Sequence, residues 1–371
     1  MVAETSAAAP VERPPRSFVG PVAWMRDNLF STWGNTILTA IGLLIAYWVV
    51  STVVSWGILT ATFVGADGSA CTREGAGACW PFITAKFAQF MYGRYPDEER
   101  WRVDLVYLLA LAGLVPLMIP SVPWKALNAV LFFAVFPVLA FVLLVGGVLG
   151  LPHVETRQWG GLLVTLVITF TGIICSLPLG ILLALGRRSS LPLIRWSSII
   201  FIEFWRGVPL ITVLFFATYM LPFFLPPSWQ IDALARVLIG VVLFAAAYMA
   251  EVVRGGLQAI PRGQYEAAMA LGLGYWRTTI FVILPQALKL VIPGIVNSFI
   301  ALFKDTTLVL IVAIFDLLGQ LRSSFADPNW ATPVTLMTGF AFAGLIYFAV
   351  SFAMSRYALY TERRLSTGVS H

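Results

Sequence analysis

The stretch RGGLQAIPRGQYEAAMALGLGYWR (Arg254–Arg277) is a polar segment between two long apolar runs. Pro261 can begin a helix, because its missing N–H costs nothing in the first turn. Gly272 and Gly274 can end that helix. The favourable run between them, Gln264–Leu271, therefore predicts a short helix lying across a membrane surface. Its alanines keep it thin enough to sit in a groove of another protein, and an idle interfacial helix is the alternative.

The composition is that of a polytopic, all-α membrane protein. Hydrophobic residues make up 59% of the chain and charged residues 11%, against roughly 25% charged residues in soluble domains. The formal charge of +6 comes from basic residues beside apolar runs, which orient a membrane protein and imply no nucleic-acid partner. Three cysteines and two histidines leave little for a metal site. The chain has no G-x-x-x-x-G-K-[ST] loop, so we expect no ATP and no other cofactor on it.

About 20 apolar residues are needed for a helix to cross the hydrocarbon core. Eight such spans are predicted, at 37–63, 103–119, 126–149, 160–185, 209–224, 233–250, 278–303 and 333–354. Segments 187–206, 254–277 and 356–364 each carry at least three basic residues. With eight spans they lie on one side with both termini, which predicts cytoplasmic termini and an interfacial 187–206 segment.

The predicted spans divide the chain into two membrane parts with tails. Residues 1–34 are a cytoplasmic tail, disordered over the first 30, and residues 366–371 are the carboxyl-terminal tail. An extension of three helices (35–157) carries a periplasmic loop, 64–102, whose five basic residues run against the charge rule. A core of five helices (158–365) follows.

Two cysteines lie close together in the periplasmic loop. Cys71 and Cys79 frame the glycine-rich sequence CTREGAGAC. In an oxidising compartment they could form a disulfide contributing ~2–3 kcal/mol by loop-closure estimates. Two unpaired thiols are the alternative.

The polar segment has the residue pattern of a known family. Glu266-Ala267-Ala268, then Gly272, then Leu284-Pro285 resembles the EAA loop of ABC importer permeases, with Val282 where that family usually has isoleucine. The stretches 160–189, 203–215, 251–268 and 303–309 (FKDTTLV) are similar to the polar amino-acid permease group. The resemblance covers about 158–365, and the added amino-terminal spans are similar to the longer permease subunit of general L-amino-acid importers.

The resemblance implies a fold, a function and partners. The five carboxyl-terminal helices are expected to form a type I ABC importer permease core in a bacterial inner membrane. Glu266, Ala267, Ala268 and Gly272, with Leu284 and Pro285, would form the helix that inserts into a separate ATP-hydrolysing subunit, which binds ATP and magnesium. The other expected partners are a second, homologous permease, a periplasmic amino-acid-binding protein and the amino acid itself. A local cap or ion pair is the alternative role for Glu266.

Two further groups of residues are candidates. Arg206, Gly207 and Pro209 match the family's R-G-x-P pattern and are expected to form a structural turn at the cytoplasmic mouth. Lys304 and Asp305, with Thr306 and Thr307, are predicted near membrane depth, where ionisable groups face a cavity or each other. An adjacent cation and anion could bind both ends of a zwitterionic amino acid, and a self-neutralising pair at a helix break or in an outer loop is the alternative.

Two other classes of function fit the sequence less well. A secondary amino-acid transporter driven by an ion gradient is expected to show inverted repeats and broken helices in both halves, but the chain shows no repeat. A membrane enzyme would need a cluster of His, Asp and Glu or a nucleophile beside a base, and no such cluster recurs. The sequence therefore predicts a transport subunit that performs no chemistry itself.

Overall fold

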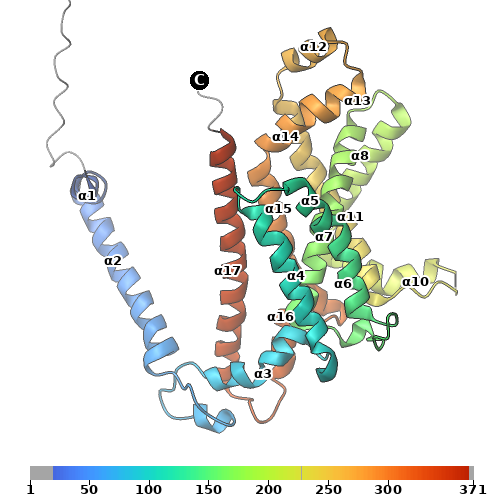
Figure 1. Cartoon of the computed structure of the whole chain (residues 1–371). Coiled ribbons are helices and arrows are strands. Elements are labelled where there is room, and N and C mark those ends of the chain that lie inside the picture. The colour runs from blue at the N-terminus through green and yellow to red at the C-terminus, as the bar shows by residue number, and fades with distance from the viewer. Residues whose placement is uncertain (1–19, 227, 367–371) are drawn as a thin grey trace, which may run out of the picture.

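A computed structural model describes residues 20–226 and 228–366, and this part of the chain is helical without a β-strand (Figure 1). The predicted 1–19 and 367–371 tail residues lie outside it. The α-helices are α1 (Pro21–Leu29), α2 (Trp33–Val54), α3 (Trp80–Tyr92), α4 (Arg100–Met118), α5 (Lys125–Val130), α6 (Phe136–Val145), α7 (Gly161–Arg187), α8 (Pro192–Gly207), α9 (Leu210–Phe215), α10 (Leu221–Phe224), α11 (Ala233–Ala259), α12 (Arg262–Ala270), α13 (Tyr275–Arg277), α14 (Leu284–Leu290), α15 (Ile292–Asp305), α16 (Leu317–Ser324) and α17 (Pro333–Ser366).

The predicted number of membrane spans is confirmed. Within the described residues, seven helices are long and apolar enough to cross a membrane, and the number is eight if a bent pair counts as one span. The bent pair is α8 with the segment Leu210–Phe224, and its two parts meet at 103°. Pro209 stands at this bend, and a proline disfavours the helical conformation in the residue before it. The segment predicted to be interfacial, 187–206, thus supplies most of α8.

The seventh span has different bounds from those predicted. The structure places it at Ile292–Val312, made of α15 and the 3₁₀ turn Thr306–Val312, and not at 278–303. Pro293 stands in the first turn of α15, where a proline is tolerated. Pro285 instead follows directly on the π-helical turn Thr278–Ile283, in a stretch that stays helical from α13 to α14. The helix breaks at Val291, two residues before Pro293, so one apolar run becomes two helices.

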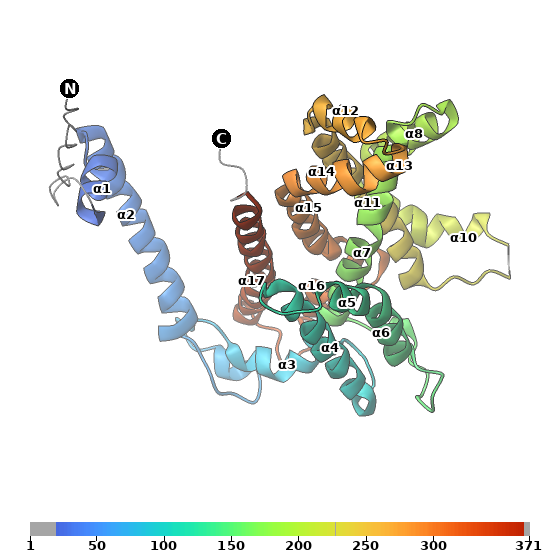
Figure 2. The ribbon, with the colours of Figure 1, turned by 45° about the horizontal axis from the view of Figure 1, so that its top comes forward.

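The expected disorder of the first 30 residues is also wrong where the structure describes them. Pro21–Leu29 forms α1, with proline in its first turn. Both views show α1 across the end of α2 (Figures 1 and 2).

The centre of the bundle is the pair α7 and α11, which lie along one another. Glycines bring the helices close: a Cβ at Gly180 would lie 2.8 Å from the Met249 side chain, and one at Gly172 would lie 2.6 Å from Leu302. Small residues of this kind let membrane helices approach. Asp232 begins α11 by accepting hydrogen bonds from the backbone N–H groups of Leu234 and Ala235, which satisfies donors that the helix leaves free.

Helix α2 stands apart from the bundle in both views (Figures 1 and 2), and none of its residues is buried. Its link to the rest is the loop before α3, where Cys71 and Cys79 form a disulfide with their Cα atoms 5.7 Å apart. This loop and α3 pack on α16, α17 and the turn between them. The Lys86 Nζ lies 2.6 Å from Asp327 Oδ2, and the backbone N–H of Cys79 donates to Thr338 Oγ1 at 2.8 Å.

The bundle has two distinct ends. Helix α12 lies at one end, with α1 and the carboxyl-terminal end of α17, and we call it the α12 end (Figure 1). Helices α3 and α16 lie at the other, the α3 end. Helix α17 has 34 residues and is about 51 Å long at 1.5 Å per residue, so it exceeds a hydrocarbon core of roughly 30 Å.

Candidate functional site

The EAA-like segment forms a short helix, α12, at the α12 end (Figure 2). Pro261 caps its start, and Gly272 follows its end with a φ of 74°, a left-handed conformation that glycine adopts at little cost. Glu266 and Ala267 are exposed, whereas Ala268 is buried. Glu266 makes no side-chain hydrogen bond or ion pair within residues 20–226 and 228–366, so the alternative of a local ion pair is not seen.

Helix α12 is held by a small set of side chains. Arg188, just beyond α7, donates from Nη1 to the Tyr265 hydroxyl at 3.0 Å, and its guanidinium carbon lies 5.6 Å from the centre of the same ring. Gln286 Nε2 donates to Gln264 Oε1 at 3.1 Å. Tyr265 and Leu284 both pack against the core cluster that includes Leu257. Pro285, the next residue of the motif, is exposed.

A cluster of charges joins α7, α8 and α11 beside α12, and we call it the Glu251 cluster. The Glu251 carboxylate lies 2.8 Å from Arg187 Nη1, 2.6 Å from Arg254 Nη2 and 3.7 Å from Arg206 Nη1. Glu203 adds a contact of 2.9 Å to Arg187. The contact between Glu251 and Arg254, three positions apart on α11, is thus part of a larger network. Pairing with three arginines stabilises a carboxylate that is only 16% exposed.

The R-G-x-P residues lie at the bend between α8 and α9. Gly207 is the last residue of α8, and Pro209 precedes Leu210, the first residue of α9. Arg206 does more than accompany a turn, because it reaches Glu251 and its guanidinium lies 5.8 Å from the centre of the Tyr248 ring. The sequence analysis did not predict Arg187 and Glu203 as members of the Glu251 cluster. Their position at the ends of apolar segments was the only sign in the sequence that they could take part.

Lys304 and Asp305 end α15, but they do not pair with each other. Lys304 is exposed and Asp305 half-buried, and in the described part of the chain neither side chain has an ion pair or a hydrogen bond. Thr306 and Thr307 donate to the backbone carbonyls of Phe303 and Lys304, at 2.8 and 2.9 Å. The alternative of a self-neutralising pair is therefore not what the structure shows, and both charges stay available.

A stripe of small and polar residues runs along α15 toward these charges. Asn297, Ala301 and Lys304 are exposed and Gly294 is half-exposed, and their spacing places them on one helix face. Beside the stripe lies an open groove of about 400 Å³ between α15 and α17, lined by Gly294, Asn297, Ser355, Ala358 and Glu362 among others. An exposed asparagine within a membrane span needs a polar partner or water.

A buried carboxylate, Asp316, lies beyond the helix break and was not predicted. It is fully buried and accepts hydrogen bonds from the Gly319 N–H at 2.8 Å and the Tyr347 hydroxyl at 2.9 Å. Burial raises the pKa of Asp316 above its usual range, and these hydrogen bonds oppose the rise. Thr165 Oγ1 accepts from the Leu317 N–H at 3.1 Å, so the network ties α7, α16 and α17 together.

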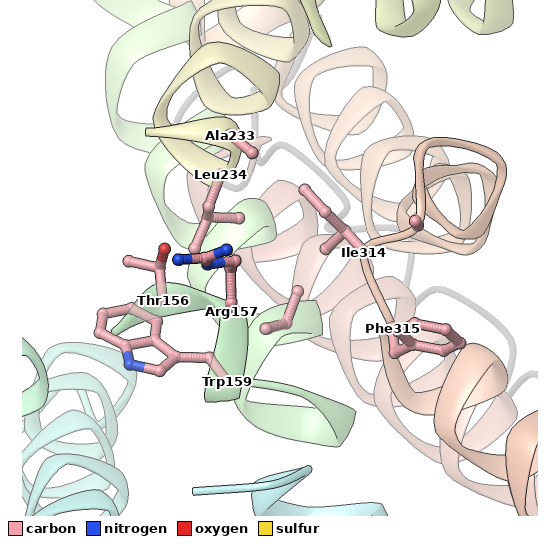
Figure 3. Close-up of a pocket in the computed structure, with 9 residues that line it drawn as sticks. Thr156, Arg157, Trp159, Ala233, Leu234, Ile314 and Phe315 are labelled. Atoms are coloured by element: carbon pink, nitrogen blue, oxygen red, sulfur yellow. The ribbon is translucent and has the colours of Figure 1, made fainter. Parts of the chain in front are cut away.

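A small pocket at the α3 end is lined by residues from three segments (Figure 3). Thr156 and Trp159 precede α7, Leu234 begins α11, and Ile314 follows the helix break. Thr156 Oγ1 donates to Asp232 Oδ2 at 2.5 Å. The pocket has a volume of about 40 Å³, which is enough for a few water molecules but too small for an amino acid. Across the residues described, no group of three His, Cys, Asp or Glu could hold a metal ion.

Comparison with known proteins places the chain in a family. A family model described as binding-protein-dependent transport system inner membrane component matches residues 176–367. The inner membrane amino-acid ABC transporter permease protein YhdY of Escherichia coli K12 is 51% identical over 348 residues, which cover 94% of each chain. The glutamate/glutamine/aspartate/asparagine transport system permease protein BztC of Rhodobacter capsulatus is 41% identical over 416 aligned residues, which cover 95% of each chain.

Other relatives match only the second part of the chain. The probable glutamine ABC transporter permease protein GlnP of Bacillus subtilis is 33% identical over 209 residues, 56% of this chain and 92% of the relative. A crystal structure of an amino acid ABC transporter with histidines covers 55% of this chain and 92% of its own, with 29% identity and a TM-score of 0.49. The chain belongs to the family of binding-protein-dependent transport system inner membrane components, as an ABC transporter permease.

Proposed function

We propose that this chain is a transmembrane permease subunit of an ATP-driven, binding-protein-dependent importer of L-amino acids. The observation that carries the proposal is α12, a thin helix between two spans that leaves Glu266 and Ala267 exposed and unpaired among the described residues. The names of YhdY and BztC support amino acids as the substrate class, because both relatives match along nearly the whole chain.

The α12 end faces the cytoplasm in this proposal. Arg187, Arg188, Arg206, Arg254 and Arg262 gather there, and basic residues favour the cytoplasmic side of a membrane. An ATPase subunit would receive α12 in a cleft and would bind ATP and magnesium, so this chain needs no cofactor. Both termini would then be cytoplasmic, and the α3 end would face the periplasm and the amino-acid-binding protein.

The amino acid would pass along α15. The polar stripe through Asn297 leads to Lys304 and Asp305, and it would be covered by a second, homologous permease rather than by lipid. Lys304 would attract the substrate carboxylate and Asp305 its ammonium group. The unpaired state of both side chains supports this role, because neither charge must first be released from the other. Thr306 and Thr307 would offer hydroxyl oxygens beside them.

The test is Glu266→Lys in the complete transporter, reconstituted in liposomes with its ATPase, second permease and receptor. Reversing this exposed charge should abolish uptake of radiolabelled L-glutamate and L-glutamine and the ATP hydrolysis that substrate stimulates. Membrane insertion should be unchanged, because the side chain supports no other contact in the described residues. The control is Glu98→Lys, the same charge change at an exposed position of the α3 end whose side chain has no partner among the described residues, and it should keep uptake. Full uptake in Glu266→Lys would refute the proposal.

A further inference from the structure

We propose that Arg188 is a positioning residue that fastens α12 directly to α7, so that a displacement of α12 moves α7 as well as the adjoining chain. The idea rests on the proposed function, in which α12 receives the motion of an ATPase. In sequence, α12 is joined only to α11 before it and to α13 and α14 after it. A contact to α7 therefore adds a second route by which force can enter the bundle.

One guanidinium makes all the contacts of this fastening. Arg188 Nη1 donates to the Leu257 carbonyl oxygen on α11 at 3.1 Å and to the Tyr265 hydroxyl on α12 at 3.0 Å. Its charge also lies over the Tyr265 ring, 5.6 Å from the centre. A planar guanidinium with five donors suits such a junction, since it can hydrogen-bond and stack at once, whereas an ammonium group cannot.

The neighbouring arginine has a separate set of contacts. Arg187 binds Glu203 and Glu251, which belong to α8 and α11, and it has no contact with α12 in the structure described. Arg188 binds α12 and takes no part in the Glu251 cluster. Two adjacent arginines at the end of α7 thus have different partners. Arg187 pairs with carboxylates of α8 and α11, and Arg188 hydrogen-bonds to Tyr265 of α12.

Few other side chains hold α12, so the Arg188 contact should matter for the position of this helix. Gln264 meets Gln286 at 3.1 Å, and the buried Ala268 and half-buried Tyr265 rest on the bundle. Without Arg188, α12 would stay helical and attached at both ends, but its position relative to α7 would no longer be set. We therefore expect a loss of coupling, and not a loss of folding.

Helix α7 leads from this contact to the other end of the molecule. It has 27 residues and spans about 40 Å at 1.5 Å per residue. Along it, Gly172 contacts Leu302 of α15 closely, and Thr165 accepts the hydrogen bond from Leu317 beside Asp316. A shift of α7 would therefore reach both sides of the helix break that carries Lys304 and Asp305.

The experiment measures uptake per ATP hydrolysed in the same reconstituted transporter, with L-glutamate and L-glutamine as probes. In Arg188→Gln we expect this ratio to fall by about twofold to thirtyfold, the range for residues in a coupling network, while assembly and thermal midpoint stay near the wild type. Arg188→Lys should recover part of the ratio, because it keeps the charge and one donor direction. Tyr265→Phe, which removes one oxygen, should lower the ratio less than Arg188→Gln.

The matched control is Arg195→Gln. Arg195 is exposed on α8 near the same end, and its side chain has no partner in the described residues. Its loss should leave the ratio unchanged. Arg188→Gln combined with Tyr265→Phe should cost less than the two effects multiplied, since both remove the same contact.

Suppose that the wild type shows substrate-stimulated ATP hydrolysis with uptake and that Glu266→Lys is inactive. Three results would then overturn the proposal. These are an unchanged ratio in Arg188→Gln, an equal fall in Arg195→Gln, or independent effects of the Arg188 and Tyr265 variants. If Arg188→Gln fails to assemble, Tyr265→Phe decides alone, and a wild-type ratio there refutes the contact. A wild-type complex without substrate-stimulated ATP hydrolysis would instead refute the proposed function.

Discussion

The two ends of the molecule are held together by different kinds of contact. At the α12 end, the Glu251 cluster and Arg188 join α7, α8, α11 and α12 through side-chain charges. The α3 end also has an ion pair, Lys86–Asp327, but there backbone groups meet directly as well: the Gly68 N–H donates to Asn329 O at 2.7 Å, and the Gly161 N–H donates to Phe315 O at 2.9 Å. The disulfide between Cys71 and Cys79 adds a covalent link there.

The difference concerns how each end can respond to displacement. Long arginine side chains can follow a carboxylate by changing rotamer, so a charge cluster tolerates small shifts of its helices. Backbone contacts and packed rings, such as Phe82 against Phe90, Phe325 and Trp330, depend on one fixed spacing. We therefore expect the α12 end to tolerate small helix displacements and the α3 end to resist them. The following variants test that contrast.

The largest effect is expected for Gly161→Ala at the α3 end. Gly161 has a φ of 63°, and an added Cβ would overlap the Phe90 carbonyl oxygen, which is backbone and cannot move aside. The strained backbone and the overlap should lower the free energy of unfolding by about 3 kcal/mol or more. The matched variant at the α12 end is Gly263→Ala, where an added Cβ meets nothing within 4 Å and a helical alanine gains about 0.5–1 kcal/mol. Thermal unfolding in detergent compares them, and equal midpoints would remove the contrast.

A medium effect is expected for Glu251→Gln. The change keeps the shape of the side chain but leaves three arginines without their shared anion. The arginines are 25–36% exposed, so water screens part of the repulsion, and we expect a loss of about 1–3 kcal/mol. Glu203→Gln is the control: Glu203 is 54% exposed and meets one arginine, so its loss should cost less than about 1 kcal/mol. Chemical denaturation at low and high salt measures both, and equal costs would show that Glu251 is not the centre.

The smallest effect is expected for Asp327→Asn at the α3 end. The hydrogen bond from Lys86 holds the pKa of Asp327 below its usual range. A carboxyl with a lowered pKa stabilises the fold above its unfolded value of about 3.9, and it loses that contribution as the pH falls through the folded value. The midpoint of the wild type should therefore exceed that of Asp327→Asn at pH 7, and the gap should close below about pH 4.

The control for this variant is Glu74→Gln, which changes an exposed carboxyl without a partner in the described residues. It should show no such pH-dependent gap. A gap for Asp327→Asn that stays constant down to pH 3 would mean that Lys86 contributes nothing through charge.

The sequence predicted what depends on the length of apolar runs and on local patterns. The number of spans and a short helix over Gln264–Leu271, observed at Arg262–Ala270, follow from hydropathy, from Pro261 and from Gly272. The bounds of the seventh span did not, because hydropathy does not show whether a helix continues through Pro285 or ends before Pro293. The turn at Arg206, Gly207 and Pro209 was predicted. That it joins α8 to the following segment as one bent apolar pair was not, because Arg195 and Arg206 make residues 187–206 resemble an interfacial segment.

The contacts that assemble the candidate site could not be predicted from the sequence, for another reason. Arg188 and Tyr265 are 77 positions apart, and Asp316 and Tyr347 are 31 apart. Local spacing gives no information on which helix faces meet, and it bears only on near neighbours such as Glu251 and Arg254, three positions apart on one helix. The unpaired state of Lys304 and Asp305 was likewise open, since neighbours in sequence can point to different sides of a helix end.

The contacts between the first loop and α16–α17 also have a consequence for biogenesis. Lys86 and Asp327 are 241 positions apart, and Cys79 and Thr338 are 259 apart. During synthesis, the first loop and α3 leave the ribosome long before α16 and α17 exist. Apolar residues there, such as Phe82 of α3, therefore stay uncovered by these helices until nearly the whole chain is made. A chain that stops before α16 would lack Phe325 and Trp330, which pack against Phe82 in the finished fold.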